Sequence, residues 1–65
     1  MIDWNMEYLT KLTQIVIDYA RNPDYNPDLE FLIELGARAG RTKGDVYEEF
    51  RNLYHALPIS WAYPQ

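Results

Sequence analysis

Apolar residues in the first third of the chain recur every three or four positions, which is the spacing of one face of an α-helix. The pattern predicts an amphipathic helix from Trp4 to Arg21, which Asp3 or Asn5 can cap. We expect one face of this helix to carry much of the core. The predicted stripe comprises Met6, Leu9, Leu12, Val16 and Ala20, and Tyr8, Ile15 and Tyr19 flank it.

Prolines separate this helix from a second one. Pro23 and Pro27 lack an amide donor and hold the residues before them extended, so the first helix has to end there. Asn26, Pro27 and Asp28 combine a capping side chain, a proline and an acid, as the start of a helix often does. We therefore expect a second helix from Pro27 to Ala39.

A third helix is expected from Lys43 to Leu57, ended by Pro58. The Thr42 hydroxyl can accept from the amide of Asp45 while the Asp45 carboxylate reaches back, which makes a short-armed capping box. The buried stripe of this helix is predicted to be Val46, Phe50, Leu53 and Leu57, with Tyr47 and Tyr54 beside it.

These elements predict an all-α fold, a small three-helix bundle over residues 1–57 with an extended tail over residues 58–65. The tail reads "PISWAYPQ", and its two prolines favour an extended chain whose alternate side chains share one face. That face can dock near Trp4 and Tyr8 or against a second copy, and we expect it to make a homodimer. Its side chains are Ile59, Trp61 and Tyr63, and the predicted core comprises Leu9, Leu12, Val16, Leu32, Leu35, Val46, Phe50 and Leu53.

Composition narrows the class of protein. With 65 residues there is room for one small domain, and 48% hydrophobic residues are enough to build its core without disulfides. The longest apolar run, Ile15 to Ile17, is far short of a membrane span, and the first residues have no basic segment of a signal peptide. We expect a cytoplasmic protein that does not enter membranes.

Neither a metal site nor an active site is predicted. Asp24, Asn26 and Asp28 have the alternating spacing that opens a calcium loop, but Leu29 and Leu35 replace its turn glycine and its bidentate acid. Catalysis needs a positioned pair of groups in a pocket, and the chain has one histidine and no cysteine. We expect no enzyme activity, no metal and no cofactor.

The segment from Leu35 to Phe50 has the residues of a tight corner between two helices. Gly36 is small enough for a helix crossing, Gly40 can take a positive φ at the turn, and Val46 and Phe50 can lock the following helix. The segment resembles the helix-turn-helix of the tetracycline-repressor (TetR) family, which typically reads Ile-Ala-x-x-Ala-Gly-Val-Ser-Lys-Gly-Thr-Leu-Tyr-x-x-Phe. The matches are Arg38, Ala39, Gly40, Lys43, Gly44, Tyr47 and Phe50, with Thr42 for serine and Val46 for leucine.

The resemblance implies a small DNA-binding or transcription-regulating protein. In the family, the helix that would start near Thr42 enters the major groove, and the equivalents of Thr42, Lys43 and Tyr47 touch phosphates or base edges. Glu48 and Glu49 depart from this pattern, and the 65 residues hold no counterpart of the family's ligand-binding domain. The predicted DNA-binding residues are Arg38, Arg41, Thr42, Lys43 and Tyr47.

The charge distribution leaves two interpretations open. The net charge is −4, yet residues 36–55 carry +1 and the remainder −5, so basic groups gather near the corner. We expect a monomer to bind DNA weakly and to need a partner copy. The alternative is that the corner only serves packing, with Arg38 paired to Glu34, and that the chain is a small acidic module that binds a protein, such as a phage- or plasmid-type inhibitor or modulator of a host protein.

Overall fold

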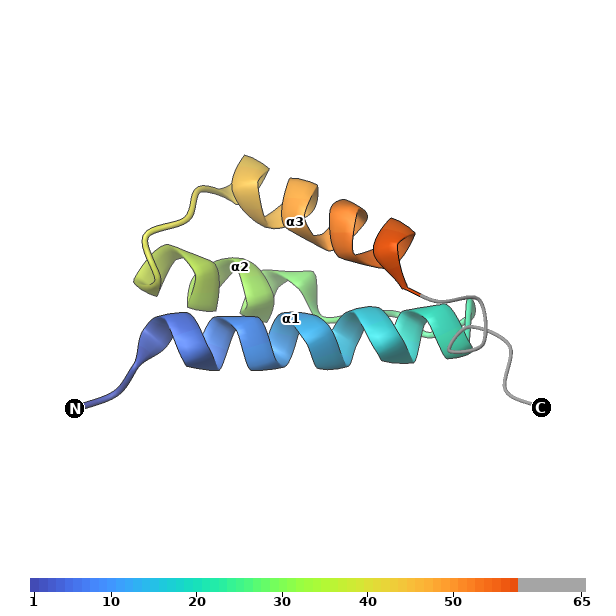
Figure 1. Ribbon diagram of the computed structural model, residues 1–65, viewed down its shortest axis with the longest axis horizontal. Helices are drawn as coiled ribbons and strands as arrows, with labels where there is room; N and C mark the ends of the chain where they lie inside the picture. The colour runs from blue at the N-terminus through green and yellow to red at the C-terminus, as the bar shows by residue number, and fades with distance from the viewer. Residues whose placement is uncertain (58–65) are drawn as a thin grey trace.

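The structure, a computed structural model, describes residues 1–57; the predicted tail, with Ile59, Trp61 and Tyr63, lies outside the described residues. Helix α1 spans Trp4–Arg21, α2 spans Leu29–Arg38 and α3 spans Lys43–Ala56. In Figure 1, α2 runs back beside α1, and α3 then reverses again and runs obliquely alongside them. Each helix packs against the other two. The all-α three-helix bundle is therefore confirmed for residues 1–57, and none of these helices is long and apolar enough to cross a membrane.

Capping side chains set where the helices begin. Asp3 rather than Asn5 caps α1, because its Oδ1 accepts from the amide of Met6 at 3.1 Å. Asp28 caps α2 by accepting from the amide of Phe31 at 3.0 Å, so α2 begins two residues after the predicted Pro27. At their other ends, α2 and α3 each stop one residue before the prediction.

The core lies where the three helices meet. Its fully buried members are Tyr8, Leu12, Ile15, Val16, Leu32 and Val46, and Leu29, Ile33, Leu35, Ala39, Phe50, Leu53 and Leu57 pack around them. Of the predicted core, Leu12, Val16, Leu32 and Val46 are therefore confirmed as buried. Leu35, Phe50 and Leu53 are only partly buried.

The predicted core face of α1 needs a correction. Leu9 was expected in the core but is 40% exposed, and Met6 is 60% exposed. The face that α2 and α3 cover is centred on Tyr8, Leu12 and Ile15, which have the same helical spacing as the predicted stripe. Leu12, Val16 and Ala20 of the predicted stripe are buried, so the observed face is rotated only part of the way from the predicted one, toward Tyr8 and Ile15. The error was one of rotation, since the length and type of α1 are as predicted.

Candidate nucleic-acid interface

The corner between α2 and α3 depends on two glycines with different roles. Gly36 is buried, and a Cβ placed there would lie 2.6 Å from Val46 Cγ2 and 3.2 Å from Tyr8 Cε1. Only a residue without a side chain allows α3 to come this close to α2 and α1. Gly40 has a φ of 85°, in the left-handed region that glycine tolerates. Both roles agree with the sequence-based prediction.

Backbone hydrogen bonds close the corner. The amide of Arg41 donates to the carbonyl of Gly36 at 2.8 Å, and the amide of Gly40 donates to the carbonyl of Ala37 at 3.1 Å. This pair of bonds is a Schellman motif, which satisfies the last carbonyls of α2 and turns the chain sharply. The chain leaves α2 in a fixed direction, and only Arg41 and Thr42 separate Gly40 from the start of α3.

The first turn of α3 forms the predicted capping box. The amide of Thr42 donates to Asp45 Oδ2 at 2.9 Å, and the amide of Asp45 donates to Thr42 Oγ1 at 3.1 Å. Hydrogen bonding by Thr42, first from its backbone amide and then from its side chain, holds the pKa of the Asp45 carboxyl below its ordinary value. The box uses the amides of Thr42 and Asp45, so those of Lys43 and Gly44 are left at the helix end without a capping partner.

Three of the predicted DNA contacts are exposed: Thr42, which caps α3, and Lys43 and Tyr47 on the helix itself. Tyr47 is 46% exposed, and Lys43 Nζ lies 6.0 Å from the centroid of its ring. One turn further on, Glu48 and Arg51 share a shallow depression with Tyr47. The exposed surface of α3 therefore presents a hydroxyl, an ammonium, the Asp45 carboxylate and a phenol in its first turns, then the Glu48 carboxylate and the Arg51 guanidinium.

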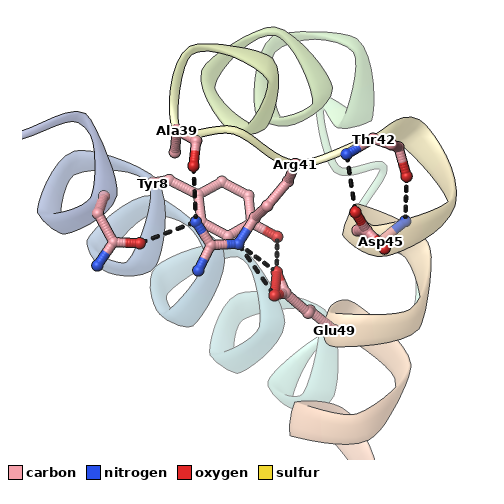
Figure 2. Close-up of polar contacts among 7 residues, drawn as sticks. Tyr8, Ala39, Arg41, Thr42, Asp45 and Glu49 are labelled. Carbon is pink, nitrogen blue, oxygen red and sulfur yellow. Dashed lines mark hydrogen bonds and ion pairs between the residues drawn. The ribbon is translucent and has the colours of Figure 1, made fainter.

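Arg41, also predicted as a DNA contact, does not belong to this surface, because its side chain is directed into the fold. Its guanidinium lies 4.3 Å from the centre of the Tyr8 ring, and its Nε donates to Glu49 Oε1 at 2.7 Å and to Oε2 at 3.0 Å. Its Nη1 donates to Asn5 Oδ1 at 2.8 Å (Figure 2). The side chain is 20% exposed and joins the corner to α1 and α3. Its positive charge is paired with the Glu49 carboxylate inside the fold.

Glu49 is turned inward by the same contacts. Besides the bonds from Arg41, its Oε1 accepts from the Tyr8 hydroxyl at 2.8 Å (Figure 2). Burial, and then the bond to the Glu49 carboxylate, raise the pKa of Tyr8 well above its ordinary range. Of the two carboxylates that depart from the TetR pattern, only Glu48 thus remains on the exposed surface.

The other predicted site residues lie apart from α3's exposed surface. Arg38 pairs with Glu34 at 3.6 Å, as expected if the corner serves packing, and its guanidinium lies 4.8 Å from the centre of the Trp4 ring. Trp4, a predicted partner-binding residue, is half-buried there. Tyr8 was predicted for the same role, but it is fully buried and forms part of the core, which corrects that assignment.

Sequence reasoning missed the Tyr8, Arg41 and Glu49 cluster. Tyr8 and Glu49 are 41 positions apart, and no local spacing relates them. The only signal was an arginine eight residues before a glutamate on the presumed reading helix, which is too weak to imply an ion pair.

No family model, curated protein or solved structure matches this chain. The likeness of residues 35–50 to the TetR helix-turn-helix therefore stays a prediction.

Proposed function

We propose that this chain is a DNA-binding module that places α3 in the major groove and its first turn against the phosphate backbone. The observation that carries the proposal is the arrangement of α3, whose first turn presents Lys43 and Gly44 to solvent while Glu49 is turned inward. A reading helix held by a glycine-mediated corner is how helix-turn-helix proteins bind DNA.

The start of α3 supplies groups for a phosphate. The amides of Lys43 and Gly44 point out of the helix end, and the Lys43 ammonium adds a full positive charge. A Cβ on Gly44 would meet only Thr42 Oγ1, at 3.8 Å, so the space in front of this residue is open to a phosphate oxygen. The capping carboxylate of Asp45 opposes the phosphate, which limits the affinity of one copy.

The next turn of α3 supplies groups for base edges. Arg51 can donate two hydrogen bonds to guanine O6 and N7, and Glu48 can accept from the amino group of cytosine. Tyr47 offers both a phenol and an apolar ring, the latter for a thymine methyl. On this basis Glu48 contributes to sequence selection, because its carboxylate is left without a hydrogen-bond donor at DNA sites that do not place a cytosine amino group opposite it.

Fluorescence anisotropy with a labelled mixed-sequence duplex at about 50 mM salt tests the proposal, because phosphate contacts are strongest at low salt. Lys43→Ala should weaken binding about three- to tenfold. It should also reduce the slope of log affinity against log salt concentration by about one, the value for one lost phosphate contact. Lys11→Ala is the matched control, since it removes the same charge from α1, where Lys11 Nζ lies 5.6 Å from the Phe31 ring centroid. Equal effects of the two substitutions, or no binding at low salt, would overturn the proposal.

A second candidate function is the binding of a protein. The net charge of −4 favours it, as does the exposed surface of α3, where Lys43 and Arg51 are offset by Asp45 and Glu48. Recovery of a tagged chain from lysate separates the two functions. A DNA-binding module should lose its partners after nuclease treatment, whereas a protein-binding module should keep one and lose it on Tyr47→Ala.

A further inference from the structure

Helix α1 has a second, uncharged face that α2 and α3 leave largely exposed within residues 1–57. We call it the α1 outer face, and it comprises the exposed residues Met6, Leu9, Thr10 and Thr13 and the half-buried Ile17. Met6 is 60% exposed and Leu9 40% exposed, and a shallow surface continues along the helix, lined by Leu9, Thr10, Thr13, Gln14, Ile17 and, at its end, Asp18. None of the five residues is charged, over about three turns of an otherwise acidic chain.

We propose that the α1 outer face binds the same face of a second copy, with the two α1 helices antiparallel. A two-fold axis between Thr10 and Thr13 would place Met6 opposite Ile17 of the partner subunit, and Leu9 close to Thr13 of the partner subunit. The larger side chains then pack at the two ends and the smaller threonines at the centre, where the helices approach most closely.

Thr13, one of the two central threonines, suits a dry contact between helices. Thr13 Oγ1 donates to the Leu9 carbonyl within α1 at 2.8 Å, so its hydroxyl keeps a hydrogen bond without water. Its methyl group is left to face the partner. A polar group that is already paired loses little when water is removed from around it.

Charges at the ends of α1 select the antiparallel arrangement. Asp3 and Arg21 are 18 positions apart, which is five full turns, so both lie on the same side of the helix. Both are exposed, and within residues 1–57 neither forms an ion pair. Antiparallel pairing brings Asp3 to Arg21 of the partner subunit twice, whereas parallel pairing would set like charges together. A second copy of this chain is therefore the occupant that this face fits.

The contact is narrow, because it involves one helix from each copy. Interfaces below about 1,200 Å² are typical of transient complexes, so we expect a dissociation constant in the micromolar range or above.

The arrangement would also suit DNA binding, a point that rests on the proposed function. The start of α3 lies near the start of α1, since Arg41 bonds Asn5 and the two helices run in a similar direction (Figure 1). Antiparallel α1 helices would send the two α3 starts toward opposite ends of the pair, with the two Asn5 positions about 20 Å apart along the helix axes. A two-fold pair of reading helices is the arrangement in which helix-turn-helix dimers contact two half-sites.

Sedimentation of the full chain from about 1 to about 500 µM tests self-association. The parent chain should move from monomer to dimer across this range, and Leu9→Glu should stay monomeric with an unchanged helical circular dichroism spectrum. Thr13→Arg is a second variant in case Leu9→Glu fails to fold, and Arg51→Glu on α3 is the control that should still dimerise. A parent chain that stays monomeric throughout, or that dimerises equally well with Leu9→Glu or Thr13→Arg, overturns the proposal.

Disulfide trapping tests the orientation, because the chain has no cysteine of its own. A mixture of Met6→Cys and Ile17→Cys chains should form the mixed disulfide dimer, whereas each variant alone should form little. In an antiparallel pair two Met6 positions lie about 16 Å apart, beyond the reach of a disulfide. Efficient trapping of Met6→Cys with itself would overturn the antiparallel arrangement. A dimer that ignores DNA would leave this inference standing and refute the proposed function, and a monomer that binds DNA would do the reverse.

Discussion

Replacing Gly36 by alanine places a methyl group at the tightest point of the fold. The new Cβ would lie 2.6 Å from Val46 Cγ2 and 3.2 Å from Tyr8 Cε1, while unstrained carbon contacts are about 3.5–4.0 Å. Val46 is fully buried, and a valine in a helix has essentially one rotamer, so it cannot turn away. Helix α3 would have to move outward by a large part of an ångström.

The cost of this movement can be set against a gain. Adding a methylene-sized group to a packed core typically costs about 1–3 kcal/mol, and alanine in place of glycine in a helix gains up to about 1 kcal/mol. Because the gap is short by about 1 Å, we expect a net loss of about 1–2 kcal/mol. For a domain of this size that loss lowers Tm by roughly 5–15 °C.

Thermal and urea unfolding followed by circular dichroism measure this loss. Gly44→Ala is the matched control, because its Cβ would meet only Thr42 Oγ1 at 3.8 Å, and it should be neutral or slightly stabilising. Adding Val46→Ala should partly rescue Gly36→Ala, with a coupling of about 0.5–2 kcal/mol in the double-mutant cycle. If Gly36→Ala matched Gly44→Ala in stability, α3 would not be held against Gly36 as described.

Three further predictions concern the corner. Gly40→Ala should lower the free energy of unfolding by about 1–2 kcal/mol because of the positive φ alone, since its Cβ would touch nothing. Gly40→Asn should lose less, because asparagine tolerates this conformation better. Equal losses for the two variants in urea titrations would contradict a backbone cause. Arg41→Met and Glu49→Gln should be coupled by about 1–2 kcal/mol in a double-mutant cycle, and strictly additive effects would show that their 2.7 Å contact does not stabilise the fold. Burial raises the pKa of Tyr8, so stability that depends on its neutral form is fully present below about pH 10 and is lost as pH rises through the raised pKa. Stability measured from pH 8 to 11 should therefore fall more steeply for the parent than for Tyr8→Phe, and parallel curves would argue against a buried phenol.

Local signals in the sequence were sufficient for the elements and the corner. Asp3, Asp28 and Thr42 each cap a helix by bonding an amide three residues ahead, an interaction that depends on nearby residues only. Gly36 and Gly40 could be assigned for a similar reason, because a close crossing and a positive φ each demand glycine.

The rotation of α1 and the polar cluster could not be predicted in this way. Two stripes on α1, one with Leu9 and one with Tyr8, have the same periodicity, and only the positions of α2 and α3 decide between them. Arg41 was predicted as a DNA contact because it is a cation near the corner. The residues that bind it, Glu49 and Tyr8, come from other positions in the sequence, and the local pattern does not show them. Pairing across helices is a property of the tertiary fold, and a pattern confined to one helix does not contain it.

The position of Tyr8 has a consequence for how the chain unfolds. Its ring meets Gly36 of α2, its hydroxyl bonds Glu49 of α3, and Arg41 of the intervening loop covers its face. Detaching any one helix would expose a large aromatic ring and leave the Glu49 carboxylate or the Arg41 guanidinium without its partner. No two-helix intermediate keeps enough of these contacts to persist, so the bundle should melt in a single cooperative transition, with the same midpoint whether it is observed by circular dichroism or by tyrosine absorbance.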